Sequence, residues 1–445
     1  MARLAIVVGT LFAAACGDNL APPPFCSVVE PVFAYAVPLH TMVRALPSRG
    51  ILLAGTFRDP FVLGGRTLVS AGGTDIFIAR IDADGSVTAS TYGDGEDQEL
   101  LEVVTNGPGD VAIAGRFRGS IEFGGGALVA SGTASSMFVA SVEPGGGHRF
   151  SVAYPVEAIL RAIAMSATGD VAISGSNFDP IDFGGGPLQT GGQFLGVLDA
   201  SGAHVASRLL ALEDKSVNLD VGIAFDRDEL VVAGSYTTSI DLGGGPLPSA
   251  GELDFYLARF ARTGAHRTST RFGGPGNDGY RGFDGDRVSI APVADGVVLA
   301  SSAQSPTDEL DDIFVTHLDD AFAPIWNQTF ALPSFQAVGA LAIAADGTIG
   351  ITGISSGETD ATVPAACGGS DTSNAFATLL DPDGRIRWSA CLPASSYSAG
   401  LSVAWRGTDE LVLAGTFDGT LDIGTRRLES ENLSGFVAVV LPACE

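Results

Sequence analysis

Asp75-Ile-Phe-Ile-Ala-Arg-Ile-Asp82, the turn Ala83-Asp84-Gly85 and the run Val87-Thr-Ala-Ser-Thr-Tyr92 form the stretch that decides the fold of this 445-residue chain. Apolar and polar residues alternate through both runs, as they do in strands with one buried face, and Asp-Gly favours a hairpin turn. The pattern continues in Leu100 to Thr105 and Val111 to Phe117. The stretch therefore predicts four short antiparallel strands and no helix.

The last of these runs recurs along the whole chain. Seven β-like runs end in a small residue before a loop, at Gly55, Gly115, Gly175, Gly234, Ser301, Gly353 and Gly415. The steps between these marks are 60, 60, 59, 67, 52 and 62 residues, so one supersecondary unit repeats with loops of varying length. Four strands per unit predict an all-β, seven-bladed β-propeller of four-stranded antiparallel blades. A long-period solenoid fits less well, because its rungs are shorter and contain fewer hairpins.

The two ends of the chain are expected to share a blade. The last unit contains the runs Leu401 to Trp405, Leu411 to Phe417 and Gly435 to Leu441, but no fourth strand follows them. Val32 to Pro38 precedes the first unit and resembles the fourth strands of other units, such as Phe150 to Pro155. We expect this N-terminal strand to complete the last blade and close the ring, which leaves no unpaired inner edge.

The composition fits a repeat fold with extensive burial. Apolar residues make up 46% of the chain and charged residues only 17%, which argues against disorder. A single core rarely grows beyond about 300 residues, whereas repeats extend by packing on their neighbours. The net charge of −27 repels phosphate backbones, so nucleic acid is excluded as a partner.

The first residues read as an export signal. Arg3 precedes the uncharged stretch from Leu4 to Ala15, which is too short to span a membrane. Ala13-Ala14-Ala15-Cys16-Gly17 resembles a bacterial lipobox, in which the cysteine becomes the lipidated first residue; Ala13 stands where that family usually has Leu. We expect residues 1–15 to be a lipoprotein signal peptide, 16–29 the lipidated cysteine and tether, and 30–445 the propeller. Secretion without a lipid anchor stays open as the alternative.

Export also permits disulfides. Cys26 lies just before the first strand and Cys444 just after the last, so a bridge between them would pin the ring shut. Cys367 and Cys391 flank the hairpin between the third and fourth strands of the sixth unit. We expect these two pairs, although four cysteines allow three pairings and the other two remain open.

Several motifs recur within the units. Gly73-Thr-Asp75-Ile-Phe77-Ile-Ala-Arg80, Ala89-Ser-Thr-Tyr92-Gly93 and Asp110-Val-Ala-Ile-Ala-Gly115 come from the first two units, and Asp254-Phe-Tyr-Leu-Ala-Arg259 from the fourth. They resemble the repeats of the bacterial seven-bladed β-propeller family called SBBP, although units five and six diverge. The resemblance implies a secreted or surface-attached propeller and transfers no catalytic residue.

Two repeated features are expected to be structural. The elements Phe123 to Gly126, Phe183 to Gly186 and Leu242 to Gly245 are expected to be bends in which Gly supplies positive φ and the preceding apolar residue plugs the blade. A phosphate cradle is the less favoured interpretation, because no helix follows these glycines. Three histidines open fourth strands and are thereby spread around the rim, too far apart to share a metal: His148, His204 and His266.

The acidic loops are the remaining candidate sites. Asp94, Glu96 and Asp97 lie in one loop, and oxygen ligands crowded in a Gly-rich loop suit a structural calcium, although solvated turns explain them as well. The long junction between the fourth and fifth units mixes aromatic, guanidinium and carboxylate groups, which suit a sugar or a peptide. The candidate ligand loop there consists of Asp278, Tyr280, Arg281, Asp284 and Asp286.

These observations predict a non-enzymatic lipoprotein, anchored in the bacterial cell envelope at the outer membrane. Its propeller is expected to act as a binding scaffold for a protein or polysaccharide, as a monomer, without a committed cofactor or metal. Contact with the membrane is expected through the lipid only. The alternative is an envelope polysaccharide lyase or hydrolase that uses the loop-rich face of the propeller.

Overall fold

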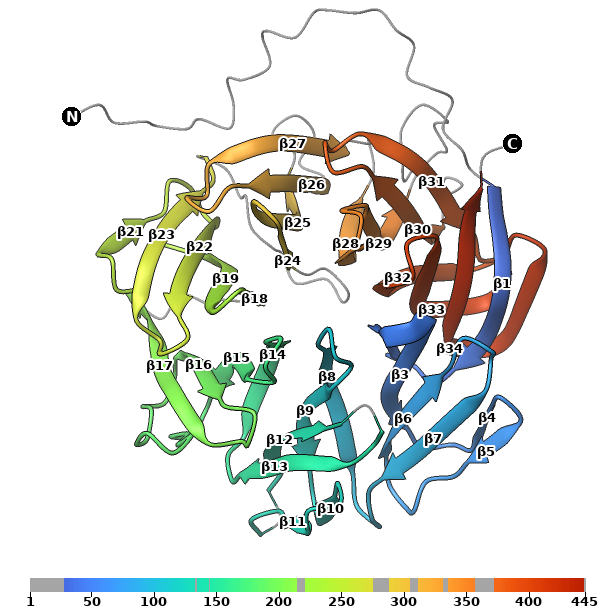
Figure 1. The fold of residues 1–445 in the computed structure, drawn as a ribbon, viewed down its shortest axis with the longest axis horizontal. Helices are drawn as coiled ribbons and strands as arrows, with labels where there is room; N and C mark the ends of the chain where they lie inside the picture. The colour runs from blue at the N-terminus through green and yellow to red at the C-terminus, as the bar shows by residue number, and fades with distance from the viewer. Residues whose placement is uncertain are drawn as a thin grey trace, which may run out of the picture.

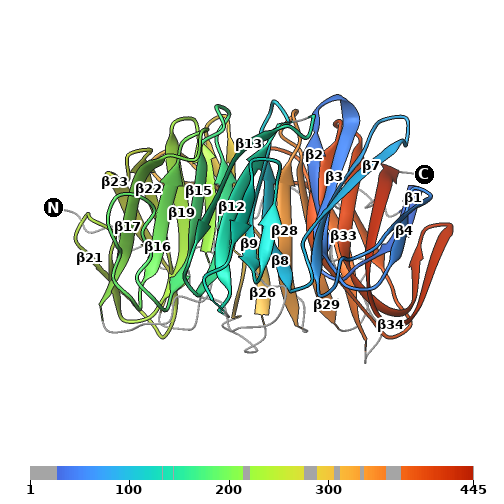
Figure 2. The same ribbon diagram turned by 90° about the horizontal axis from the view of Figure 1, so that it is seen from below.

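The chain forms an all-β ring of seven antiparallel blades around a central axis (Figure 1). This computed structural model describes residues 28–132, 134–143, 145–213, 221–274, 288–304, 311–330, 335–356 and 372–443. Seen from the side, the ring is a disc in which the strands run between the two faces (Figure 2). The predicted seven-bladed propeller of four-stranded blades is confirmed.

Each blade runs from an innermost strand at the axis to an outermost strand at the rim. In that order, blade one consists of β2 (Met42–Leu46), β3 (Gly50–Phe57), β6 (Asp75–Ile81) and β7 (Val87–Tyr92). Blade two consists of β8 (Gln98–Thr105), β9 (Val111–Phe117), β12 (Ser136–Val142) and β13 (His148–Tyr154). Blade three consists of β14 (Ala158–Met165), β15 (Val171–Asn177), β16 (Gln193–Leu198) and β17 (His204–Glu213). Blade four consists of β18 (Val221–Asp226), β19 (Glu229–Tyr236), β22 (Asp254–Ala261) and β23 (His266–Phe272). Blade five consists of β24 (Ser289–Val293), β25 (Gly296–Gln304), β26 (Asp311–Leu318) and β27 (Pro324–Phe330). Blade six consists of β28 (Gln336–Ile343), β29 (Ile349–Ser356), β30 (Ser373–Leu380) and β31 (Ile386–Leu392). Blade seven consists of β32 (Tyr397–Arg406), β33 (Glu410–Ile423), β34 (Arg426–Ala443) and β1 (Val28–Val37).

The ring closes as the sequence predicted. β1 pairs antiparallel with β34, from Val28 opposite Ala443 to Val37 opposite Gly435. The first strand of the chain is thus the outermost strand of the last blade, and the two lie side by side at the edge of the disc (Figure 1). No terminal blade is left with a missing strand.

The core lies between neighbouring blades. In β9, every residue from Val111 to Phe117 is buried except Arg116, because blades pack against both faces of this strand. The outermost strand β7 instead has no buried residue, and half-buried and exposed residues alternate from Val87 to Ser90. Position within the blade thus explains why second strands read as continuous apolar runs and fourth strands as alternating ones.

Short two-stranded ribbons join the second and third strands in several blades. They are β4 (Phe61–Leu63) with β5 (Arg66–Leu68), β10 (Ser120–Glu122) with β11 (Ala127–Val129), and β20 (Ser239–Asp241) with β21 (Pro246–Pro248). In blade seven, β33 and β34 themselves extend outward and stay paired to Ile423 and Arg426. β17 also extends and pairs with β20, which links blade three to the ribbon of blade four. The sequence did not predict these additional pairings.

Four inner strands carry a bulge at the same level. The register shifts around Leu101 in β8, Arg161 in β14, Gly339 in β28 and Leu401 in β32. A bulge leaves one residue outside the ladder and re-aims its side chain. All four of these residues line the central cavity. No helix among the described residues is long and apolar enough to cross a membrane.

Candidate functional site in the central channel

The ligand loop predicted from Asp278, Tyr280, Arg281, Asp284 and Asp286 lies outside the described residues. The same holds for Cys16 and for three of the four cysteines predicted to form disulfides, Cys26, Cys367 and Cys444. Cys391 lies in β31 and packs against the hydrophobic cluster between blades five and six. Both disulfide pairings and the ligand loop therefore stay predictions.

The acidic loop after β7 uses its carboxylates to build turns. Asp94 accepts hydrogen bonds from the backbone N–H groups of Glu96 (2.9 Å) and Ser120 (2.6 Å). Asp97 accepts one from the N–H of Thr74 at 3.0 Å, and this bond lowers the pKa of Asp97. Within the described ranges, no three His, Cys, Asp or Glu side chains converge as metal ligands. The interpretation of these acids as turn residues accounts for their contacts.

The glycine-rich elements are bends, as predicted. Phe183 is 5% exposed and plugs its blade, while Gly184 and Gly186 have φ of 110° and 102°. Leu242 plugs the next blade in the same way, and Gly243 and Gly245, which follow it, have φ of 106° and 99°. In both blades the preceding aspartate caps the bend; Asp182 Oδ1 accepts from the N–H groups of Gly184 and Gly186 at 2.7 and 3.0 Å. These glycines are accounted for by local backbone structure.

The histidines at the rim explain the middle glycine of each bend. A Cβ placed on Gly185 would lie 2.3 Å from Cε1 of His204, so only glycine leaves room for the imidazole. Nε2 of the same imidazole ring lies 3.0 Å from Oγ of Ser207, within hydrogen-bonding distance. His148 and His266 repeat the arrangement in their own blades. The predicted rim position is confirmed, whereas the pairing of histidine with glycine was missed.

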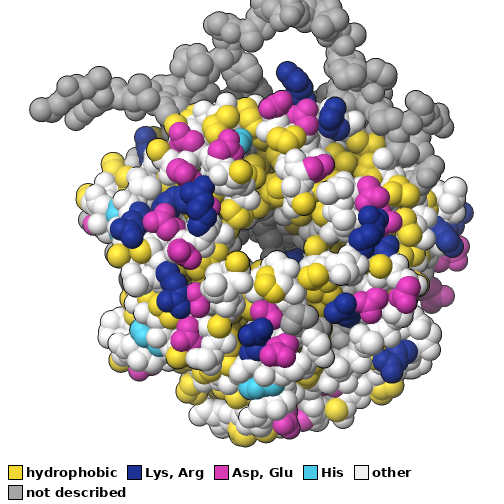
Figure 3. Space-filling view, viewed as in Figure 1, with side chains coloured by type: hydrophobic (Ala, Val, Ile, Leu, Met, Phe, Trp, Pro, Cys, Tyr) yellow, Lys and Arg dark blue, Asp and Glu magenta, His cyan; other side chains and the backbone are white. Residues whose placement is uncertain are grey.

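A cavity of about 1340 Å³ occupies the centre of the ring and is lined by all seven innermost strands. The space-filling view shows the molecule hollowed at this point, with apolar side chains around the opening (Figure 3). In each of the other six innermost strands, the wall residue at the ladder position equivalent to that of Arg44 is small or apolar. These are Val104, Ala164, Ala224, Ala291, Ala342 and Ala404.

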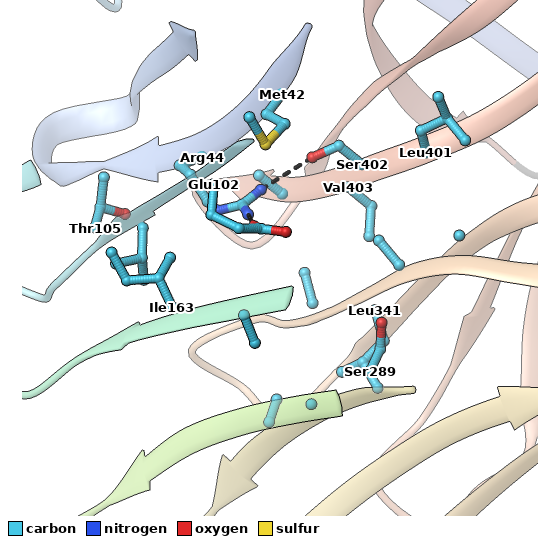
Figure 4. Close-up of a pocket in the computed structure, with 18 of the residues that line it drawn as sticks. Met42, Arg44, Glu102, Thr105, Ile163, Ser289, Leu341, Leu401, Ser402 and Val403 are labelled. Carbon is cyan, nitrogen blue, oxygen red and sulfur yellow. Dashed lines mark hydrogen bonds and ion pairs between the residues drawn. The ribbon is translucent and has the colours of Figure 1, made fainter. Parts of the chain in front are cut away.

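One sector of this wall is polar. Arg44 of β2 donates from Nη1 to Oγ of Ser402 in β32, at 3.0 Å, and lies 4.0 Å from the carboxylate of Glu102 in β8. The three side chains come from blades one, seven and two, which are neighbours around the closure, and they point toward one another (Figure 4). Ser402 also accepts from the N–H of Val43 at 3.1 Å, so it ties the first blade to the last. Glu102 is buried but has a cation beside it.

Arg161 is the second cation of the wall. It is the bulge residue of β14 and lines the cavity, with Leu101 and Val221 on the two neighbouring strands at the same level. Its Nε is shielded from solvent and has no hydrogen-bond partner among the described residues. A buried donor without a partner costs free energy, which an acceptor on a ligand would offset. The arrangement can therefore hold an anionic group against an apolar wall.

Sequence reasoning missed Arg44, Glu102 and Arg161 as a group. They come from three different repeats, and only closure of the ring brings them to one wall. The signal in the sequence is a charged residue inside an otherwise apolar innermost strand, as Arg161 is within Ala158–Met165. Arg161 lines the cavity at the axis.

The comparisons with known proteins find a likeness of fold alone. No family model matches the chain, and no curated protein matches it. Among solved structures, the β-propeller domain of the Trilobed protease from Pyrococcus furiosus is similar at 10% identity and a TM-score of 0.45, covering 93% of this chain and 97% of that one. A protein of unknown function from Bacteroides caccae is 12% identical with a TM-score of 0.37, and the match covers 73% of this chain and 92% of that one. The phage phi92 endosialidase is 9% identical with a TM-score of 0.43, and the match covers 95% of this chain and 70% of that one.

Proposed function

We propose that this chain is an SBBP-type cell-envelope lipoprotein whose propeller is a non-enzymatic binding module for a protein partner. The observation that supports the proposal is a series of exposed apolar side chains in four consecutive blades. They are Leu433 (49% exposed), Val62 (59%), Val129 (71%) and Phe178 (58%), in blades seven, one, two and three. Val62, Val129 and Phe178 lie in the segments that join the second and third strands of their blades, and Leu433 lies in the outward extension of β34.

Exposed apolar side chains of this size are candidate contacts for a partner, and here they extend over four neighbouring blades. Val62 and Val129 are carried by paired ribbons, and Leu433 by the long hairpin of β33 and β34. The hydrogen-bonded ribbons hold Val62 and Val129 in place, which lowers the entropy lost on binding. Three of the four side chains are aliphatic and bury best against an apolar protein surface, whereas sugars are held by hydrogen bonds and ring stacking. These features favour a protein over a polysaccharide.

A binding experiment tests this surface. The mature protein and a variant with Val62, Val129, Phe178 and Leu433 changed to Ser would be immobilised and exposed to envelope extract, and the retained protein would be identified and purified. Ile325→Ser is the matched control, because Ile325 is equally exposed, at 49%, but lies on β27 of blade five. We expect the purified partner to bind the wild type and the control equally, and the four-serine variant at least about tenfold more weakly.

Two outcomes would contradict the proposed surface. One is a partner that binds the four-serine variant as tightly as the wild type. The other is binding that survives proteinase treatment of the extract but not digestion of its polysaccharides, which would assign the module to a polysaccharide.

The lipid anchor is a separate part of the proposal. β1 begins at Val28 on the outer edge of blade seven, so a tether from Cys16 would hold the disc by its rim. We expect Cys16→Ala to move the protein from the membrane fraction to the soluble fraction and to abolish incorporation of labelled palmitate. Retention of the variant in the membrane fraction would contradict lipidation at this cysteine.

A further inference from the structure

We propose that the central channel binds a small organic acid that has an apolar body, with Arg161 as the residue that holds its carboxylate. This inference goes beyond the proposed partner surface and does not depend on it, because Arg161 is not one of the residues of that surface. It rests on the cavity, on the bulge that directs Arg161 into it, and on the buried Nε of that side chain.

The bulge is what makes Arg161 part of the channel. In β8, β28 and β32 the residue at the same bulge is Leu101, Gly339 or Leu401, and each of these also lines the cavity. Three blades thus present an apolar side chain or none at this position, and blade three presents a guanidinium. Leucine is evidently compatible with the bulge, so the arginine is not required by the backbone there.

The charges of the wall are mixed, and Arg161 is the cation whose Nε has no hydrogen-bond partner among the described residues. Arg44 and Arg161 are positive, whereas Glu102, Asp418 and Glu431 are negative, and Glu102 lies 4.0 Å from Arg44. Glu99 also lines the cavity, but its carboxylate is 2.5 Å from Nε of Arg116 and is neutralised by it. Arg161 belongs to blade three, whereas Asp418 and Glu431 belong to blade seven, so a carboxylate beside Arg161 meets this cation at the shortest range.

The rest of the wall selects the body of the ligand. Leu101 and Val221 flank Arg161 on the neighbouring strands, and Leu401 and Leu341 lie farther around the ring (Figure 4 shows the last two). Guanidinium groups pair with carboxylates through two parallel hydrogen bonds, and aliphatic walls bury hydrocarbon. An acid with a short alkyl or aryl body satisfies both, whereas a fully hydrated anion such as phosphate satisfies only the first.

Calorimetric titration of the mature protein with four probes tests the proposal. Hexanoate carries both features, hexanol only the apolar body, acetate only the carboxylate, and inorganic phosphate only a charge. We expect hexanoate to bind saturably at one site and the other three at least about tenfold more weakly. Hexanol lacks the hydrogen bond to a charged group, which contributes about one to two factors of ten, and acetate and phosphate lack the alkyl chain that the apolar wall would bury. Absence of saturable hexanoate binding would overturn the proposal, as would phosphate binding as tightly as hexanoate.

Three variants assign the site to Arg161. Arg161→Leu introduces the residue used by blades two and seven, and Arg161→Gln provides a polar second choice if the first does not fold. Both are expected to weaken hexanoate binding by about tenfold or more. Glu102→Gln removes a competing negative charge and is expected to tighten binding. Arg66→Leu, at an exposed arginine of the β4–β5 ribbon, is the control and is expected to change nothing. Equal binding by the wild type and a folded Arg161 variant would overturn the assignment.

Discussion

The guanidinium of Arg406, in the last blade, donates a 2.8 Å hydrogen bond to the backbone carbonyl of Ala83, in the first blade. It also donates from Nε to the carbonyl of Arg49 (2.8 Å) and from Nη1 to Glu410 (3.0 Å). Arg406 is only 6% exposed and Glu410 8%. Near the axis, therefore, the closure depends on a buried ion pair and on bonds to backbone, in addition to the β1–β34 ladder at the rim.

Replacing Arg406 by Met should destabilise the ring strongly. The substitution leaves the Glu410 carboxylate with only Arg49, 2.9 Å away, and leaves the carbonyls of Arg49 and Ala83 without this donor. Breaking a buried pair costs about 3–5 kcal/mol, and we expect a loss of this size in the free energy of unfolding measured in urea. Arg427→Met is the control, because the pair of Arg427 with Asp422 is exposed on both sides and should contribute little. Equal effects of the two substitutions would refute the role given to Arg406.

Gly185→Ala should destabilise the third blade through its contact with His204. The new Cβ would lie 2.3 Å from Cε1 of the imidazole, and forcing a side chain aside in this way costs about 1–3 kcal/mol. The double variant with His204→Ala should recover part of that loss, because it removes the obstructing ring. Gly107→Ala is the control, since a Cβ there meets no atom within 4 Å. Strict additivity of the Gly185 and His204 effects in thermal unfolding would count against the contact.

Asp75→Asn should raise the melting temperature at neutral pH. Asp75 is 2% exposed; burial raises the pKa of its carboxyl above the usual value of 3.8, and the nearby charge of Asp94 adds to this. The folded state therefore holds the proton more tightly than the unfolded state does. The stability that this group contributes is greatest below pH 3.8 and is lost as the pH rises through the folded-state pKa. Asn374 occupies the equivalent position in blade six, so the amide is compatible with the site.

The gain from Asp75→Asn should accordingly be present at about pH 7 and shrink toward about pH 4. Asp84→Asn is the control, because hydrogen bonds from Ser86 lower the pKa of Asp84 and its ionised form is the favoured one. A melting temperature that rises equally for both variants, or that rises for Asp75→Asn by the same amount at both pH values, would show that burial of the charge is not the cause.

The predicted bridge between Cys26 and Cys444 can be tested by mapping disulfide-linked peptides under non-reducing conditions. Val28 pairs with Ala443, so the two cysteines lie next to the paired ends of β1 and β34 in the sequence. We expect a peptide that joins them, and a loss of about 2–5 kcal/mol in stability for the double serine variant. A peptide that joins Cys444 to Cys391 instead would replace this pairing with one of the two alternatives.

The sequence predicted the structural features that depend on a single repeat. It did not predict the features that arise only when several repeats pack together. β6 from Asp75 and β7 from Val87 to Tyr92 follow from local alternation and turn residues, and so do the rim histidines. The bulge at Arg161 and the position of His204 over Gly185 depend instead on how strands lie once the blade is assembled. The residues of the channel wall come together only when the seven innermost strands surround one axis, so they could not be grouped from the sequence of any one repeat. Candidate sites chosen from loops alone consequently overlooked the cavity.

The pairing of β1 with β34 also sets the order in which the molecule is completed. β1 leaves the ribosome before the other described strands, yet its partner β34 is made after all of them. Six blades can stack during synthesis while β1 still has no ladder to join, and an interrupted chain keeps that strand unpaired. An exposed β1 would therefore distinguish an unfinished or truncated product from a finished one, and a protease that cleaves extended segments would remove only the former.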